Sequence, residues 1–138
     1  MAEGILRFKT DAQGLKIKID SAGTESIHVG ENPDPRATQT AKEHGVDISR
    51  LVARQINRND FDAFDLILVA EAHVYNEVIR ISRHESDKKK VDFIMNLIHP
   101  DSNKAVPDPY YGGMDGFEKV YDMLDKVCDA IIVKVEKK

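Results

Sequence analysis

The chain has 138 residues, of which 41% are hydrophobic and 32% charged, and its net charge of −4 argues against a protein that binds mainly to nucleic-acid phosphates. Its length suits one domain over residues 1–138, and no apolar run approaches the roughly 18 residues that a membrane span needs. The single cysteine, Cys128, excludes an internal disulfide, so we expect a cytoplasmic protein of one domain with no nucleic-acid or membrane partner.

The first half of the chain predicts a helix, a strand and a second helix. Residues 1–10 have helical apolar spacing, and no capping residue precedes them, so we expect the chain to start inside this helix. Residues 15–20 alternate apolar and charged side chains, as a half-buried strand does. Asp34 can cap a helix that Pro35 begins, and Gly45 marks its end.

The second half predicts a strand followed by helices. Residues 66–70 form a continuous apolar run, which indicates a strand of a parallel sheet covered on both faces. Residues 72–82 predict a helix, residues 83–90 predict a solvated polar loop, and the apolar residues 91–98 fit either type of element. A long amphipathic helix begins near Gly116, and its apolar stripe consists of Phe117, Val120, Tyr121, Leu124, Val127, Cys128, Ile131 and Ile132. We interpret the cysteine on this stripe as a core residue, and the alternating periods as an α/β fold.

The sequence VPDPYYGG, residues 106–113, places one carboxylate on a stiff loop. Asp108 lies between Pro107 and Pro109, and prolines fix their own φ and keep the preceding residue extended. A carboxylic acid held still beside aromatic rings suits general-acid catalysis. An ordinary turn before a helix is the other interpretation, because Pro, Asp and Gly are the usual turn residues.

Several segments, in order, resemble the low-molecular-weight protein tyrosine phosphatase family. The matching segments are Met1-Ala2-Glu3-Gly4, Asp20-Ser21-Ala22-Gly23-Thr24, Val29-Gly30, Pro33-Asp34-Pro35-Arg36-Ala37, His44-Gly45, Ala53-Arg54-Gln55, Asp60-Phe61-Asp62, Phe64-Asp65-Leu66-Ile67-Leu68, the VPDPYYGG segment, Gly116-Phe117-Glu118 and Val120-Tyr121-Asp122. The resemblance implies a three-layer, doubly wound fold with a four-stranded parallel sheet. It also implies hydrolysis of phosphotyrosine, in a protein or a small aryl phosphate, through a cysteinyl-phosphate intermediate.

The resemblance assigns roles to individual residues. Asp108 matches the general acid that protonates the tyrosine oxygen and later activates water. Ser21 matches a hydroxyl that braces the phosphate-binding loop, although a turn hydroxyl that bonds to local backbone is an equal alternative. The residues expected to bind substrate are Tyr110, Tyr111, Ile27 and His28. Ile27 stands where many eukaryotic members carry a substrate-facing Trp.

The family's phosphate loop does not occur in these 138 residues. That loop is a Cys, five residues and an Arg, and it stands directly before the helix that begins Met-Ala-Glu. Here Met1 is the first residue, and five residues separate Cys128 from Lys134. Leu51 also stands where relatives commonly carry a loop-supporting His, and Glu71 replaces a frequent Asp. We therefore expect an N-terminally truncated domain that lacks the first central strand and the loop, and no phosphatase activity from these residues alone.

Three hypotheses follow from this expectation. The chain is an ordinary phosphatase whose recorded start lies too late, or it is a non-catalytic interaction or regulatory module derived from the phosphatase fold. In the third, a partner chain completes the sheet as a homodimer or by domain swapping. The five histidines show no metal-ligand spacing, so we expect no metal and no other cofactor.

Overall fold

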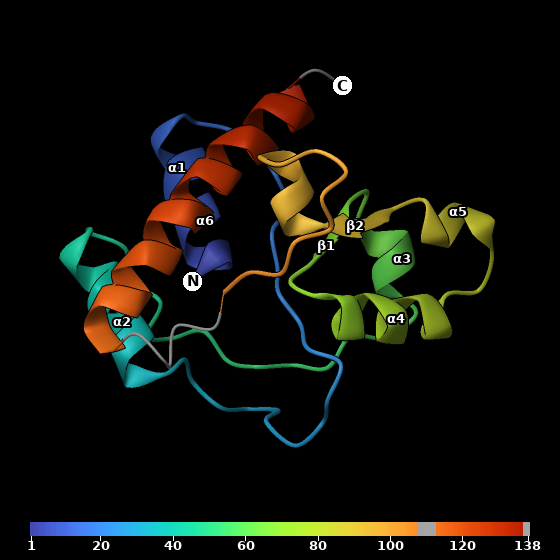
Figure 1. The fold of residues 1–138 in the computed structure, drawn as a ribbon, viewed down its shortest axis with the longest axis horizontal. Helices are drawn as coiled ribbons and strands as arrows, with labels where there is room; N and C mark the ends of the chain where they lie inside the picture. The colour runs from blue at the N-terminus through green and yellow to red at the C-terminus, as the bar shows by residue number, and fades with distance from the viewer. Residues whose placement is uncertain (108–112, 137–138) are drawn as a thin grey trace. The chain divides into compact units, whose positions relative to one another are not determined.

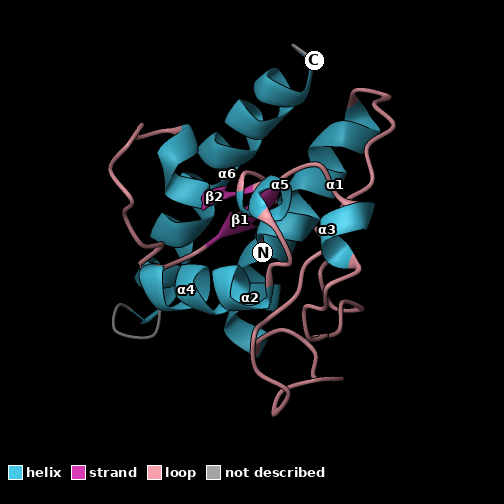
Figure 2. Ribbon diagram, turned by 90° about the vertical axis from the view of Figure 1, so that its right-hand side faces the viewer, coloured by secondary structure: helices cyan, strands magenta, loops and turns pink. Residues whose placement is uncertain are grey.

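The structure, a computed structural model, describes residues 1–107 and 113–136. The chain forms two compact units, which are described separately (Figure 1). Unit 1 consists of Met1–Ser21, Gly30–Ala53 and Pro107–Lys138, and unit 2 consists of Ala22–Val29 and Arg54–Val106. Helices dominate the described part of the chain, and two short strands form its sheet, as Figure 2 shows in cyan and magenta.

The described residues of unit 1 form three helices. They are α1 (Ala2–Ala12), α2 (Pro35–Glu43) and α6 (Gly113–Glu136), and α6 packs against both of the others. The apolar stripe predicted for the last helix is confirmed, because all eight of its residues are buried. The helix itself begins three residues earlier than the sequence predicted, at Gly113.

Helix α2 begins and ends where its local signals predict. The Asp34 carboxylate accepts a hydrogen bond of 2.8 Å from the Arg36 N–H, and Pro35 is the first helical residue. After the helix, Gly45 has a φ of 81°, a left-handed conformation that favours glycine. Both boundaries of this helix are therefore confirmed.

Unit 2 contains a two-stranded parallel sheet with short helices around it. Its elements are α3 (Asp60–Ala63), β1 (Ile67–Val69), α4 (Ala72–Ile81), α5 (Glu85–Lys88), β2 (Val91–Phe93) and the 3₁₀ helix η1 (Ile94–Leu97). Ile67 pairs with Val91, and Val69 pairs with Phe93. The core of the unit consists of Phe61, Val69, Val78, Val91 and Phe93. The predicted strand at 66–70 and helix at 72–82 are confirmed, and the ambiguous residues 91–98 are a strand followed by a 3₁₀ turn.

The four-stranded sheet is not formed by the described residues, which contain two paired strands and one isolated parallel bridge between Gly23 and Gln55. The predicted strand at residues 15–20 is wrong. Backbone groups of this segment bond to α1 instead of a ladder: the Leu15 N–H donates to the Thr10 carbonyl at 2.9 Å, and the Ile19 carbonyl accepts from the Arg7 side chain. Alternating side chains permit a strand, but a strand also requires a neighbour for its backbone.

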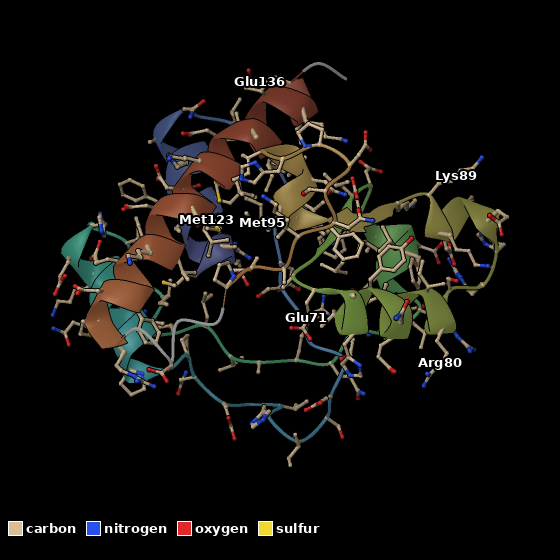
Figure 3. The ribbon with its side chains drawn as sticks, viewed as in Figure 1. Glu71, Arg80, Lys89, Met95, Met123 and Glu136 are labelled. Atoms are coloured by element: carbon tan, nitrogen blue, oxygen red, sulfur yellow. The ribbon has the colours of Figure 1, made fainter. Side chains whose placement is uncertain are left out.

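The segment at residues 83–90 is mostly exposed, as predicted, but it is not all loop, because it contains the short helix α5 and a buried carboxylate. Asp87 is 2% exposed and accepts hydrogen bonds from Arg83. Lys89 and Arg80 do point into solvent, as Figure 3 shows. No helix in the described ranges is long and apolar enough to cross a membrane.

Candidate active site

Asp108, the predicted general acid, lies outside the described residues. The same is true of Tyr110 and Tyr111, the two aromatic residues predicted to bind substrate. Their roles stay predictions. The structure does describe where their segment begins: the Val106 N–H donates to the Ala70 carbonyl at 2.8 Å, and Ala70 directly follows β1. Ligands of α/β proteins bind beyond the carboxyl ends of parallel strands. Val106, the first residue of the VPDPYYGG segment, lies beside the carboxyl end of β1.

Ser21 lies at the N-terminal turn of α1. Its hydroxyl donates to the Glu3 carboxylate at 2.5 Å, and the same carboxylate accepts from Arg7 Nε at 2.8 Å. The Ser21 hydroxyl therefore bonds to a side chain of α1, and not to local backbone as a simple turn hydroxyl would. Helix N-termini attract anions, because their first N–H groups have no partner in the helix. The predicted role of Ser21 as a brace for a phosphate loop stays a prediction.

Ile27 and His28 belong to unit 2, whereas Ser21 belongs to unit 1. Ile27 is 76% exposed. The loop that carries both residues is tied to Gln55, whose side chain donates to the Thr24 carbonyl at 3.1 Å. Their predicted contacts with substrate remain predictions.

Cys128 is confirmed as a core residue. It is 0% exposed in the second half of α6, and its Sγ lies 3.6 Å from the Ala2 carbonyl oxygen. Burial raises the pKa of this thiol to about 12. A nucleophilic cysteine needs a thiolate at neutral pH and access for substrate, and Cys128 has neither.

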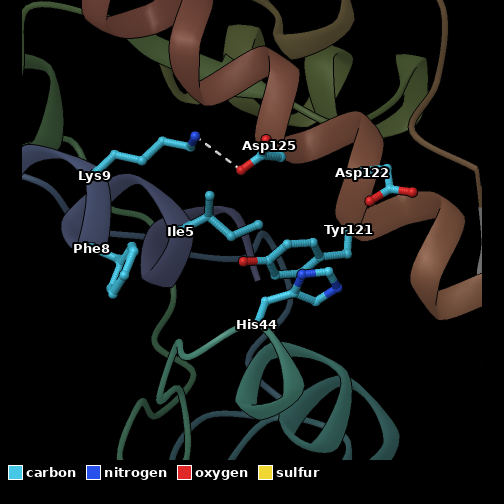
Figure 4. A pocket seen from close by; sticks show the side chains of 7 residues that line it. All are labelled: Ile5, Phe8, Lys9, His44, Tyr121, Asp122 and Asp125. Carbon is cyan, nitrogen blue, oxygen red and sulfur yellow. Dashed lines mark ion pairs between the residues drawn. The ribbon is translucent and has the colours of Figure 1, made fainter.

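One cluster of potential metal ligands was not predicted from the sequence. His44, which follows α2, hydrogen-bonds through Nε2 to Glu118 Oε2 on α6 at 2.9 Å, and its ring stacks on Tyr121 with a centroid distance of 3.9 Å (Figure 4). The potential ligand atoms of His44, Glu118 and Asp122 all lie within 4.8 Å of one another. The four-residue spacing of the two carboxylates on the predicted helix could have indicated that they share a face. Nothing in the sequence connects His44 to them, because it is 74 residues away from Glu118 in the chain.

Comparisons with known proteins settle the family. The family model described as "Low molecular weight phosphotyrosine protein phosphatase" matches residues 1–138. The chain belongs to this phosphatase family. A putative low molecular weight protein-tyrosine-phosphatase of Synechocystis is 38% identical over 138 residues, which cover 99% of this chain and 87% of that protein. The human low molecular weight phosphotyrosine protein phosphatase is 32% identical over 136 residues, with coverages of 97% and 85%.

Solved phosphatase structures share the fold. A crystal structure of the Entamoeba histolytica protein tyrosine phosphatase has a TM-score of 0.88 at 32% identity, covering 99% of this chain and 87% of that one. YfkJ of Bacillus subtilis has a TM-score of 0.84 at 25% identity, with coverages of 99% and 85%. The α/β fold class and the family resemblance are thus confirmed. The same comparisons do not support the N-terminal truncation expected from the sequence, because they match 99% of the chain.

Proposed function

We propose that this chain acts on phosphotyrosine, carried by a protein or a small aryl phosphate, and that Asp108 protonates the departing tyrosine oxygen. Membership of the tyrosine phosphatase family supports the substrate class. The stiff setting of Asp108 between Pro107 and Pro109 supports its role as an acid. The family resemblance assigns substrate binding to Tyr110, Tyr111, Ile27 and His28, and stacking on aromatic rings favours aryl over alkyl phosphates by about 1 kcal/mol.

The second part of the proposal is that these 138 residues do not complete the hydrolysis by themselves. The observation that carries it is the state of the single cysteine. Cys128 is buried within α6, with its pKa raised to about 12, and no Cys-x5-Arg sequence occurs in the 138 residues. Loss of a nucleophile costs on the order of 10⁴-fold or more in rate, because no covalent intermediate forms.

Turnover of p-nitrophenyl phosphate by the purified 138-residue chain tests this part. We expect no hydrolysis above the buffer rate, and no change on Cys128→Ala. A measurable rate that Cys128→Ala abolishes would overturn the assignment of Cys128 to the core. A rate that only Asp108→Asn abolishes would reveal a nucleophile other than this cysteine.

A gain-of-function experiment tests the first part separately. The family's strand and Cys-x5-Arg-Ser-Pro loop are joined ahead of Met1, and the chimera is assayed with a phosphotyrosine peptide. We expect turnover that falls about 10²- to 10⁴-fold on Asp108→Asn, the usual contribution of a general acid. Asp115→Asn, which alters an exposed carboxylate in the first turn of α6, is the matched control and should have little effect. An active chimera that is indifferent to Asp108→Asn rules out the acid role.

A non-catalytic interaction module is the second candidate function, and the buried thiol also favours it. Such a module binds phosphotyrosine poorly or not at all and acts through other contacts. Fluorescence anisotropy with a labelled phosphotyrosine peptide, and with its unphosphorylated form, measures phosphate recognition. Weak or equal binding of the two peptides without turnover supports the module, and tight, preferential binding of the phosphopeptide contradicts it.

Self-association is the remaining proposal about partners. In the described part of the chain, β1 and β2 pair only with each other and form a two-stranded sheet. An unpaired strand edge is a template for another chain. A homodimer or a domain swap would supply a second neighbouring strand for β1.

The cytoplasmic location expected from the sequence also stays a prediction.

A further inference from the structure

One nitrogen and two carboxylates converge on the surface of unit 1. His44 belongs to the C-terminal end of α2, whereas Glu118 and Asp122 both belong to α6. Each of the three side chains offers a ligand atom, and these atoms lie within 4.8 Å of one another. None of the three has a role in the phosphatase chemistry proposed above.

Two of the three side chains, His44 and Glu118, are held in place before any ligand arrives. Glu118 and Asp122 are four residues apart on one helix, so they share a face, and paired metal ligands often have this spacing. The His44 backbone N–H caps α2 by donating to the Ala41 carbonyl at 3.0 Å. Its ring stacks on Tyr121, which is 5% exposed, at an interplanar angle of 11°. The stack directs Nε2 toward the carboxylates, so little side-chain freedom is lost on binding.

The geometry points to a zinc site, and we propose that His44, Glu118 and Asp122 bind Zn²⁺. The two atoms of the His44–Glu118 hydrogen bond are 2.9 Å apart, whereas two ligands on a tetrahedral zinc ion lie about 3.3 Å apart, from bonds of about 2.0 Å. Asp122 would complete the set, because its carboxylate oxygen lies within 4.8 Å of the other two ligand atoms. Imidazole and carboxylate together suit zinc, while Mg²⁺ and Ca²⁺ prefer oxygen ligands alone. Two carboxylates and a neutral imidazole give the site a charge of about −2, which attracts a divalent cation.

The fourth coordination position has room for water. A cavity of about 200 Å³ adjoins the cluster, and it is lined by Ile5, Phe8, Lys9, His44, Tyr121, Asp122 and Asp125 (Figure 4). The Lys9 ammonium, the cation in this lining, is turned toward Asp125, 2.9 Å away, and also pairs with Asp129. Its charge is therefore neutralised by carboxylates outside the proposed site. A zinc site with three protein ligands and a fourth position open to solvent can exchange its water ligand.

Bound zinc would join the end of α2 to the first half of α6. An ion that binds only the folded chain raises its stability as the free ion concentration rises. The experiment uses the purified 138-residue chain, stripped with EDTA and carrying Cys128→Ala so that no thiol can coordinate. Isothermal titration with ZnCl₂ and thermal unfolding in the presence of ZnCl₂ or MgCl₂ are measured in a buffer that does not chelate metals. We expect saturable binding of one zinc ion, a rise in Tm that EDTA reverses, and no comparable rise with Mg²⁺.

Asp122→Asn is the decisive variant, because it removes a ligand and leaves the His44–Glu118 hydrogen bond in place. We expect its zinc affinity to fall about tenfold or more, with an unchanged Tm in EDTA. Glu118→Gln is the second ligand variant, and Asp115→Asn, on the same helix and outside the cluster, is the matched control that should bind like the parent. Absence of saturable binding overturns the proposal. Equal zinc affinities of the parent and Asp122→Asn also overturn it. The same holds if Asp115→Asn loses as much zinc affinity as Asp122→Asn, or if Mg²⁺ competes with zinc at a similar concentration.

Discussion

Arg83 shows how one side chain can organise a segment that looks merely soluble in the sequence. Its guanidinium donates to Asp87 Oδ2 at 2.9 Å and to Asp62 Oδ1 at 2.7 Å, and its backbone N–H also donates to Asp87. Asp87 is buried and Asp62 is 68% exposed. A buried carboxylate is tolerated only when it is paired and hydrogen-bonded. The hydrogen bonds from Arg83 hold the pKa of Asp87 at about 2, below its ordinary value, and they also lower the pKa of Asp62.

The lowered pKa of Asp87 predicts a loss of stability in acid. Because the folded-state pKa is depressed, the carboxylate contributes stability above its unfolded pKa of about 4, and this contribution disappears as the pH falls toward about 2. Asp87→Asn should lower Tm at pH 7 by several degrees and flatten the dependence of Tm on pH between 4 and 2. Thermal unfolding followed by circular dichroism across this range measures both effects. The matched variant Asp62→Asn, in an exposed partner of Arg83, should change Tm less, and an equal effect of the two variants would contradict the role given to burial.

At the scale of elements, α1 lies so close to the segment after α2 that one position tolerates only glycine. Gly4 is buried in α1, and a Cβ built there would lie 2.3 Å from Ile48 Cγ2 and 3.4 Å from Val46 Cγ1. Ile48 is fully buried, so it has little space into which it can move. The closeness of α1 to this segment depends on the missing side chain.

Gly4→Ala should therefore destabilise the chain. Alanine gains about 1 kcal/mol of helix propensity over glycine, but overpacking costs about 1–3 kcal/mol, so a net loss of about 1 kcal/mol is expected. Urea unfolding measures the free energy. In an Ile48→Ala background the obstructing methyl is gone, and Gly4→Ala should become neutral or stabilising. Gly23→Ala is the control, because a Cβ added to Gly23 would meet no atom within 4 Å, and a loss there as large as at Gly4 would argue against a steric cause.

The elements that the sequence predicted well are those whose signals are local. The start of α2 is set by the cap Asp34 and the first helical residue Pro35, and its end by the left-handed Gly45. The stripe of α6 is long enough for its period to be unambiguous. Residues 15–20 have an equally clear period, but a strand needs a partner that periodicity does not supply.

Contacts between distant residues were beyond prediction. Arg83 and Asp62 are 21 residues apart, and His44 and Glu118 are 74 residues apart, so no spacing rule connects either pair. Of the candidate site, Cys128 was placed correctly because an apolar helical stripe predicts burial. The partner of the Ser21 hydroxyl, Glu3, lies 18 residues away and became visible only in the structure.

For the molecule as a whole, the proposed self-association depends on the backbone groups of β1 that face away from β2. The Ile67 N–H donates to the Lys90 carbonyl, on the β2 side of β1. Successive residues of a strand direct their backbone groups to opposite edges, so those of Leu68 face the other edge. A three-residue strand is short, which limits how tightly its edge can hold another chain.

We therefore predict weak, reversible self-association that depends on this edge. Size-exclusion chromatography with multi-angle light scattering should show a mass that rises from monomer toward dimer with concentration. Leu68→Pro removes the N–H that faces away from β2 while leaving the β1–β2 hydrogen bond of Ile67, so it should shift the equilibrium toward monomer. Circular dichroism at low concentration shows whether this variant still folds. A parent chain that stays monomeric at every concentration and unfolds cooperatively would mean that the edge of β1 needs no second chain.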